Sequence, residues 1–194
     1  MIISKTPYRI SFFGGGTDYP EWYLKNGGEV LSTSINKYLY LSCRYLPNFF
    51  NYKYRIAYSL IENAKEIKDI KHPVVKKMLE KYYNDKKGLE IHYDGDLPAR
   101  SGMGSSSVFI VGFLNLLNTL RKKNVFPKKL ANESIYFEQK ILKETVGSQD
   151  QIATAYGGFN SIKFFKDGTY KVNKILINKE KQKILFNNLY LVYT

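Results

Sequence analysis

Asp96-Leu97-Pro98-Ala99-Arg100-Ser101-Gly102-Met103-Gly104-Ser105-Ser106-Ser107 is the stretch that decides the fold of this chain. It follows an alternating, strand-like segment and leads into a run, ending near Leu120, that is apolar on most sides and predicts a helix buried within a domain. Glycines let successive backbone N–H groups point into one concavity, and the first turn of the helix adds unpaired N–H groups and the positive end of its dipole. The stretch therefore predicts a loop that binds an anion such as phosphate.

The serines of this loop add hydroxyl groups to the predicted anion site. Ser105, Ser106 and Ser107 stand where a phosphate-bound Mg²⁺ could be ligated. The alternative is that a serine caps the helix, although one serine would suffice for that. The loop is not the usual P-loop, because Gly-Lys-Ser/Thr is missing, and the third glycine of a Rossmann fingerprint would fall at Ser107.

Hydrophobic periodicity predicts the elements on either side of the loop. Strands are expected at 2–5, 8–13, 29–35, 38–45, 54–58, 88–93, 159–165, 170–177 and 188–194. Helices are expected at 19–25, 73–83, 105–120, 128–143 and 150–156. The strands at 29–35 and 38–45 are expected to pair around Asn36-Lys37. This order predicts one α+β domain over 1–194, with helices packed on a mixed or antiparallel sheet.

Composition restricts the class of protein. The 194 residues, 44% of them hydrophobic, are enough for one good core. Cys43 is the single cysteine, so an intrachain disulfide is excluded, and with His72 and His92 it does not make a zinc set. No apolar run has the length of a membrane span, and the N-terminus does not read as a signal peptide. A soluble, cytoplasmic protein without a membrane partner is expected.

The formal net charge of +13 raises the question of nucleic-acid binding. Five of the 30 basic residues are arginines, and the lysines are spread along the chain rather than gathered beside aromatic residues. Proteins that read bases favour the arginine fork. We therefore expect no nucleic-acid partner and interpret the charge as a solvated basic surface that helps to attract anionic substrates.

Three segments resemble, in the right order, motifs of the GHMP kinases, named for galactokinase, homoserine kinase, mevalonate kinase and phosphomevalonate kinase. The segments are Thr6-Pro7-Tyr8-Arg9 through Gly14 to Thr17-Asp18-Tyr19, Pro98 to Ser107, and Gly147-Ser148-Gln149-Asp150-Gln151. The second matches the family signature of proline, three residues and Gly-Leu-Gly-Ser-Ser-Ala, with Met103 for leucine and Ser107 for alanine. The resemblance covers most of 1–164 and implies the N-terminal domain of an ATP-dependent kinase.

Roles carry over from the family to matching positions, with ATP and Mg²⁺ as cofactors. Ser106 and Glu138 would bind Mg²⁺. Asp150 would accept or orient the acceptor hydroxyl, and Arg9 stands where the family keeps a cation near the transferring phosphoryl group. The loop residues expected to bind the nucleotide are Pro98, Arg100, Ser101, Gly102, Met103, Gly104, Ser105, Ser106 and Ser107. The residues expected to contact the acceptor are Gly15, Gly16, Thr17 and Asp18.

Each single residue also has a plain structural interpretation. Glu138 could be an ordinary exposed helix residue, and Arg9 could pair with a surface carboxylate. Asp150 could cap the short helix that follows it, and Asp18 could cap the helix at 19–25.

Two departures from the family pattern bear on substrate and activity. Galactokinases carry Glu-His where this chain has Gly15-Gly16, and the Gly-Gly-Gly-Thr-Asp form looks more like the heptose-phosphate kinases. The resemblance thus implies a sugar or sugar-phosphate acceptor, such as heptose 7-phosphate. Family members continue into a second domain, which is expected to follow the strand at 188–194 and to be missing here. Either the chain is a fragment, or a partner chain or a homo-oligomer supplies that domain, or the chain is a truncated, non-catalytic module that binds nucleotide or a partner.

Overall fold

A single twisted sheet organises the protein in the computed structural model, which describes residues 1–99, 101–190 and 192. Its seven strands are β1 (Ile2–Phe13), β2 (Gly28–Leu46), β3 (Tyr54–Ala57), β4 (Ile61–Ala64), β5 (Gly88–Gly95), β6 (Phe159–Phe164) and β7 (Tyr170–Lys174). The strand order is β4-β3-β5-β2-β6-β7, and β1 pairs with β2. Because β3 and β5 are parallel and the other pairs antiparallel, the sheet is mixed.

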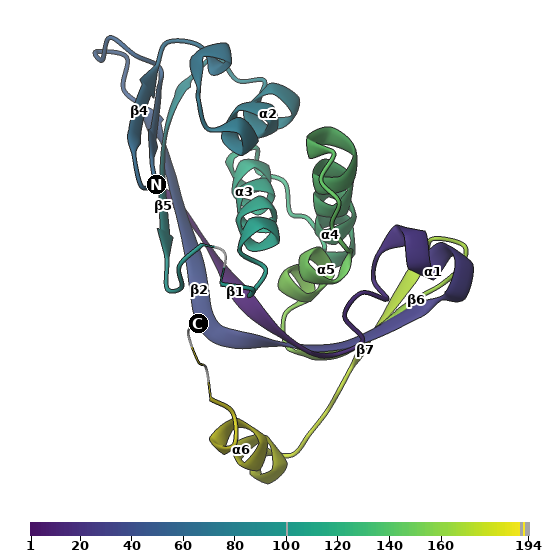
Figure 1. The fold of residues 1–194 in the computed structure, drawn as a ribbon. Helices are drawn as coiled ribbons and strands as arrows, with labels where there is room; N and C mark the ends of the chain where they lie inside the picture. The colour runs from purple at the N-terminus through teal and green to yellow at the C-terminus, as the bar shows by residue number, and fades with distance from the viewer. Residues whose placement is uncertain (100, 191, 193–194) are drawn as a thin grey trace.

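Helices cover one face of this sheet. They are α1 (Pro20–Asn26), α2 (Pro73–Tyr82), α3 (Ser105–Leu120), α4 (Pro127–Tyr136), α5 (Gln149–Tyr156) and α6 (Lys179–Asn187), with a 3₁₀ turn η1 (Ile67–Asp69) and a π-helical segment η2 (Phe137–Leu142). In Figure 1, α2 to α5 lie together on one side of β1, β2 and β5, whereas α6 stands apart after β7. The predicted α+β class, with helices packed on one mixed sheet, is confirmed.

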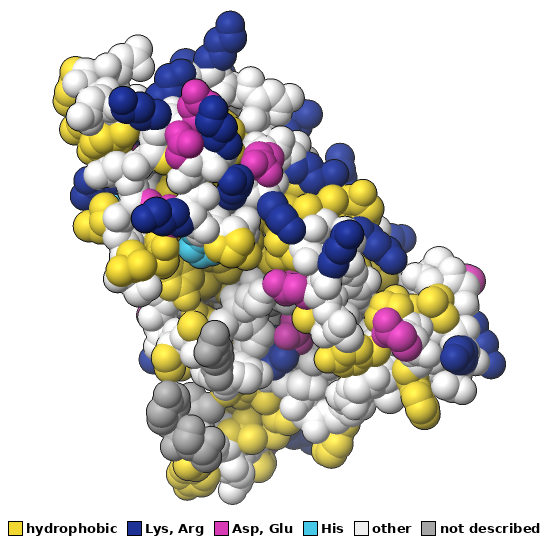
Figure 2. Space-filling model, turned by 45° about the horizontal axis from the view of Figure 1, so that its top comes forward, with side chains coloured by type: hydrophobic (Ala, Val, Ile, Leu, Met, Phe, Trp, Pro, Cys, Tyr) yellow, Lys and Arg dark blue, Asp and Glu magenta, His cyan; other side chains and the backbone are white. Residues whose placement is uncertain are grey.

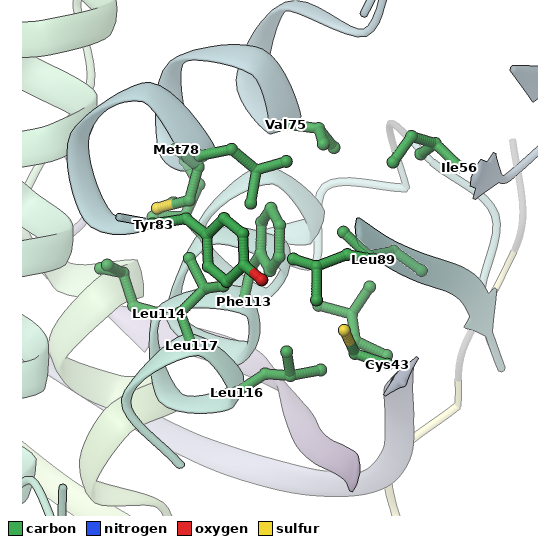
Figure 3. Packing of buried hydrophobic residues seen from close by; sticks show 14 of the residues in the cluster. Cys43, Ile56, Val75, Met78, Tyr83, Leu89, Phe113, Leu114, Leu116 and Leu117 are labelled. Atoms are coloured by element: carbon green, nitrogen blue, oxygen red, sulfur yellow. The ribbon is translucent and has the colours of Figure 1, made fainter. Parts of the chain in front are cut away.

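The core lies between α3 and the sheet. Figure 3 shows Phe113, Leu116 and Leu117 of α3 meeting Met78 of α2 and Leu89 of β5. All five side chains are at most 1% exposed. Truncating such a side chain to alanine typically costs about 2–5 kcal/mol, so α3 is firmly fixed on the sheet. Its first turn, which carries the serines, is thereby held at one place above β1.

One strand replaces the pair expected at 29–35 and 38–45, so that prediction was wrong. β2 runs unbroken through Asn36-Lys37, and its register with β1 shifts there, because Pro7 pairs with Tyr38 but Arg9 with Ser34. Between these two pairs β2 has more residues than β1. The additional residues form an irregularity that bends β2, and they do not form a reversing turn. The two halves of β2 take different neighbours on their other edge, β6 before the bend and β5 after it.

Further elements differ from expectation: β1 joins the strands expected at 2–5 and 8–13, and β4 was not predicted. The helix expected over 128–143 is α4 followed by the π-helical η2, and η2 ends at Lys143 with a left-handed φ of 59°. The strand expected at 188–194 is absent from residues 188–190 and 192, and its other positions lie outside the described residues. The preceding helix α6 was not predicted, and its N-cap is Asn178, whose side chain accepts from the N–H of Lys181.

The surface carries the charge that the composition requires. Figure 2 shows lysine and arginine side chains spread over the upper part of this face, with acidic and apolar side chains between them. In the described part of the chain, none of the helices is long and apolar enough to cross a membrane.

Candidate active site

Segments that are far apart in the sequence surround a cavity of about 740 Å³. Its wall comes from β1, the glycine loop before α1, the loop at 101–104, the first turn of α3, η2 and the start of α5. The lining residues are Arg9, Ile10, Ser11, Gly15, Gly16, Asp18, Tyr19, Ser101, Gly102, Met103, Gly104, Ser105, Ser106, Ser107, Glu138, Val146, Gly147, Gln149 and Asp150. Residues from all three family-like segments thus meet at one place.

The start of α3 opens into this cavity without a side-chain cap. Gly104 is the N-cap residue, with a left-handed φ of 75°, and no side chain bonds the free N–H groups of the first turn. The capping interpretation of the serines is therefore not what the structure shows. The hydroxyls of Ser101 and Ser105 are buried and have no hydrogen-bond partner among the described residues. Uncapped N–H groups, the helix dipole and free hydroxyls together suit an anion.

Glu138 is a buried carboxylate next to the serine loop. It is 0% exposed and lies in the π-helical segment η2, a geometry that is frequent at functional sites. Its Oε1 accepts from Ser106 Oγ at 3.1 Å, its Oε2 accepts from Ser107 Oγ at 2.8 Å, and Gln151 Nε2 donates to Oε2. Burial raises the pKa of Glu138 to about 7, although these hydrogen bonds oppose the shift. The interpretation as an exposed helix residue does not hold.

The pair of Ser106 and Glu138 fits the coordination chemistry of Mg²⁺. Both side chains offer hard oxygen donors, and they are in contact at the cavity wall. A nearby cation would favour the charged form of a carboxyl group whose pKa burial has raised. Among the described residues there is no cluster of three or more metal-binding side chains. This agrees with Mg²⁺ sites that use one or two protein ligands and take the rest from phosphates and water.

Arg9 and Asp150 form a bidentate ion pair at the wall of the same cavity. Arg9 Nε donates to Oδ1 at 2.6 Å and Nη2 donates to Oδ2 at 2.7 Å. Arg9 Nη1 also donates to the carbonyl of Gly102 in the loop, at 2.9 Å. The side chains are 12% and 25% exposed, so this is not a surface pair. Asp150 lies in the first turn of α5 and its carboxylate bonds Arg9, whereas the N-cap position belongs to Ser148.

Asp18 ties the glycine loop to α5. Its Oδ2 accepts from the N–H of Gln149 at 3.0 Å, and its Oδ1 accepts from the N–H of Gly16 at 3.2 Å. A Cβ atom at Gly147 would lie 1.9 Å from Oδ2, so this approach requires glycine there. Asp18 does not cap α1, because the N-cap residue of that helix is Tyr19. Asp18 therefore holds the glycine loop in a fixed relation to the start of α5, which carries Asp150.

Not every expected site residue lies on the cavity wall. Arg100 is outside the described residues. Pro98 and Thr17 do not line the cavity, and the Thr17 hydroxyl is used within the loop, where it donates to the carbonyl of Gly14 at 2.7 Å. Gly15 and Gly16 do line it, and a Cβ atom at either would meet nothing within 4 Å.

Sequence reasoning missed three polar lining residues. Ser11 lies two positions after Arg9 on β1, so strand alternation could have placed both on one face. Gln149 precedes Asp150, and Tyr19 follows Asp18, within segments whose neighbours were already assigned. Their position next to assigned site residues was the signal that could have identified them.

Comparison with known proteins finds one matching family model and several sugar kinases as relatives. Residues 67–158 match the family model "GHMP kinases N terminal domain". A D-glycero-alpha-D-manno-heptose 7-phosphate kinase of Campylobacter jejuni is 26% identical over 187 residues, which cover 91% of this chain and 54% of that protein. A galactokinase of Pyrococcus furiosus is 26% identical over 185 residues, covering 95% of this chain and 52% of that protein. The chain therefore spans about half the length of these curated relatives.

A solved structure shows the same fold. A D-glycero-D-manno-heptose 1-phosphate kinase from Bacteroides thetaiotaomicron superposes with a TM-score of 0.82 at 26% identity, covering 93% of this chain and 61% of that one. The mixed sheet, the buried helix after the serine loop and the family match define one class of domain. Residues 67–158 match the N-terminal domain of the GHMP kinases, and the fold of the chain is that of the solved sugar-phosphate kinase.

Proposed function

We propose that this chain is the ATP-binding part of a sugar kinase, which transfers the γ-phosphoryl group of Mg·ATP to a hydroxyl of a sugar or sugar phosphate. The observation that carries the proposal is that a pair of candidate metal ligands and a bidentate ion pair line the same cavity. Ser106 and Glu138 offer oxygen donors for a metal at the uncapped start of α3, and Arg9 and Asp150 face the same space. Phosphoryl transfer needs mainly positioning and charge neutralisation, which such a set supplies.

The loop and helix start would hold the phosphates. The free hydroxyls of Ser101 and Ser105 and the unpaired N–H groups of the first turn of α3 are donors without protein partners in the described residues. Ser106 and Glu138 would hold Mg²⁺, which would supply positive charge to offset the charge that develops on the phosphates. Binding of the cation would favour loss of the proton that Glu138 partly carries near neutral pH.

Asp150 would act on the acceptor. The acceptor oxygen forms a bond to the γ-phosphorus while the bond from that phosphorus to the oxygen of the leaving ADP breaks. The proton of the acceptor hydroxyl passes to the Asp150 carboxylate, which orients this hydroxyl beforehand. Arg9 holds both oxygens of the carboxylate and also bonds the Gly102 carbonyl, so it fixes Asp150 relative to the phosphate loop.

The acceptor would enter beside the glycine loop. Gly15 and Gly16 leave open space where any other residue would place a side chain, which suits a bulky acceptor. The names of the relatives favour a seven-carbon sugar phosphate or a hexose as the acceptor. Heptose 7-phosphate is the acceptor we propose first.

Incubation of the chain with Mg·ATP and a panel of sugars and sugar phosphates tests the proposal. The panel contains heptose 7-phosphate, heptose 1-phosphate and galactose, and transfer is followed by ADP release and by mass spectrometry of the product. Nucleotide binding is measured separately by calorimetry. Transfer to one acceptor supports the proposal. ATP binding without transfer to any acceptor supports instead the non-catalytic nucleotide-binding module and overturns independent kinase activity.

A further inference from the structure

The side chain of Gln149 lines the cavity, and the reaction described above does not use this side chain. Gln149 opens α5, directly before Asp150, and is 4% exposed. Its Oε1 accepts from Ser11 Oγ at 2.9 Å, and its backbone N–H donates to Asp18 Oδ2 at 3.0 Å. Ser11 thus holds the carboxamide through its oxygen, Asp18 holds the backbone N–H of the same residue, and Gln149 lines the cavity.

The N–H groups of this amide make almost no hydrogen bonds to the described residues. A primary carboxamide has two N–H donors. Among the described residues, the one contact of Nε2 is with Asp150 Oδ1 at 3.5 Å, the outer limit of a hydrogen bond. Buried polar groups normally have partners. A ligand oxygen in the cavity would accept a hydrogen bond from the N–H groups that the protein leaves without a good acceptor.

The position of the amide decides which ligand oxygen it can reach. Nε2 lies beside Oδ1 of Asp150, whose carboxylate, in the proposed function, accepts the proton of the reacting hydroxyl. Hydroxyl oxygens on neighbouring carbons of a sugar lie within hydrogen-bond distance of each other. An amide next to Asp150 therefore suits the hydroxyl on the carbon next to the one that is phosphorylated.

The charges of the lining residues near Gln149 suit a ligand group that is neutral. Ser11, Gly15, Gly16 and Tyr19 contribute no charge to the cavity wall, and the charged group in contact with the backbone of Gln149 is the Asp18 carboxylate, which would repel a phosphate. Of the described lining residues, Arg9 is the one cation, and both carboxylate oxygens of Asp150 already engage it. Within the described part of the chain, this wall suits hydroxyl groups and offers no unpaired cation to a phosphate.

We propose that Gln149 is a specificity-determining residue that binds the hydroxyl next to the phosphorylated one, so that the acceptor is a sugar carrying a vicinal diol. Ser11 fixes the orientation of the amide by donating to its oxygen. The inference rests on the proposed function, because Asp150 marks the reacting hydroxyl. A phosphate group on the acceptor, where one is present, lies away from Gln149.

Binding of neutral sugars without nucleotide tests this assignment. D-galactose and D-mannose, each with its set of monodeoxy derivatives, are titrated by ligand-observed NMR against the wild type, Gln149→Met and Gln182→Met. Methionine keeps the length of the side chain and removes the amide. Gln182 lies exposed on α6, outside this cavity, and its replacement is the matched control.

The expected result is a specific loss of discrimination. For the preferred sugar, the wild type binds one monodeoxy form about tenfold more weakly or worse, because a buried polar group then lacks its partner. Gln149→Met binds the parent sugar about as weakly as that deoxy form, while Gln182→Met behaves as the wild type. Equal weakening of parent and deoxy sugars by Gln149→Met would show that Gln149 merely positions the wall and overturns the proposal. A wild type that does not discriminate any parent sugar from its deoxy forms also overturns it.

Two controls keep this outcome separate from folding and from catalysis. If circular dichroism shows that Gln149→Met does not fold, Gln149→Asn makes the same comparison, because it keeps the amide but withdraws it by one methylene. Transfer from Mg·ATP is assayed in parallel. Absence of transfer with intact discrimination overturns the kinase function alone, whereas transfer that is indifferent to Gln149→Met with every deoxy sugar overturns this inference alone.

Discussion

Arg9 holds Asp150 with two parallel hydrogen bonds, from Nε at 2.6 Å and from Nη2 at 2.7 Å. This geometry joins the middle of β1 to the first turn of α5. A planar guanidinium fork matches a carboxylate at both oxygens, which a lysine could not do. The pair therefore fixes the orientation of the carboxylate as well as neutralising it, and the third bond of Arg9, to Gly102, extends this order to the phosphate loop.

Asp150→Asn is expected to abolish most transfer while leaving the fold intact. Asparagine preserves the size of the side chain but removes the charge that accepts or orients the hydroxyl proton. Turnover in a competent assay should fall on the order of 10²-fold or more, with little change in ATP affinity. Steady-state kinetics and nucleotide calorimetry measure the two effects separately.

Asp94→Asn is the matched control for this change, because Asp94 lies exposed on β5, away from the cavity. It should retain the turnover of the wild type. Unchanged turnover in Asp150→Asn would remove this residue from the chemistry, whatever the serine loop binds.

Ser106→Ala should weaken the use of Mg·ATP by about tenfold or more, since the metal loses an oxygen ligand. The fold should survive, because Ser106 does not cap α3 and Ser107 keeps two hydrogen bonds to Glu138. Ser161→Ala, which removes a hydroxyl that donates to Glu29 outside the cavity, is the control. A thermal melt and an ATP titration at several Mg²⁺ concentrations distinguish the cases. A variant that unfolds but binds nucleotide normally when folded would favour a structural role.

The serine loop and the elements around it could be predicted because their signals are local. Glycines, an apolar helical run and helix stops depend on near neighbours in the chain, so α2, α3 and α5 were placed within one or two residues of their observed bounds. The unbroken course of β2 could not be predicted. Asn36-Lys37 is typical of a turn, and what keeps the strand extended is pairing with β1, β5 and β6, which local sequence does not reveal.

The candidate site shows the same division. The family motifs placed Arg9, Ser106, Glu138 and Asp150, and all four line one cavity. The use of Thr17 inside the loop and the contact of Asp18 with the start of α5 depend on tertiary approach, which residue type alone does not indicate. The role of Gln149 depends on its bond to Ser11, a residue 138 positions away.

His72 is expected to make stability depend on pH. It stacks on Phe109 at 5.6 Å and contacts Tyr58 edge to face at 5.0 Å, and burial lowers the pKa of His72. Below the ordinary value of about 6.5 the unfolded chain then binds more protons than the folded one, so stability is present above that pH and is lost as the pH falls.

The pH dependence can be assigned by replacing each of the two histidines in turn, because Glu138, whose pKa burial raises to about 7, contributes a slope of opposite sign that is common to the wild type and both variants. His72→Asn keeps a side chain that can cap α2, as His72 does by accepting from the N–H of Val75. It should lower the melting temperature at all pH values but flatten the decline between pH 7 and 5. His92→Asn, measured alongside, shows which histidine carries the slope. Parallel curves for the wild type and His72→Asn would contradict the prediction.

Gly104→Ala and Gly102→Ala form a matched pair that isolates one contact in the site. Both glycines have a left-handed φ, 75° and 73°, so alanine is strained at either position by about 1–2 kcal/mol. Their surroundings differ. A Cβ atom at Gly102 would meet nothing within 4 Å, whereas one at Gly104 would lie 3.0 Å from Oδ2 and 3.3 Å from Cγ of Asp150. The backbone strain is therefore the same in both variants. A difference in turnover between them reports the displacement of the Asp150 carboxylate by the added Cβ atom at position 104.

We expect the two variants to lose similar stability in a denaturant titration but to differ in transfer. Gly104→Ala must displace Asp150 by a few tenths of an ångström, which disturbs its two short bonds to Arg9 and the orientation of the acceptor hydroxyl. Turnover should fall about tenfold further in Gly104→Ala than in Gly102→Ala, because misplacing a catalytic group by a small distance is costly. Equal turnover in the two variants would mean that the carboxylate tolerates displacement and that its bidentate contact with Arg9 does not set the reaction geometry.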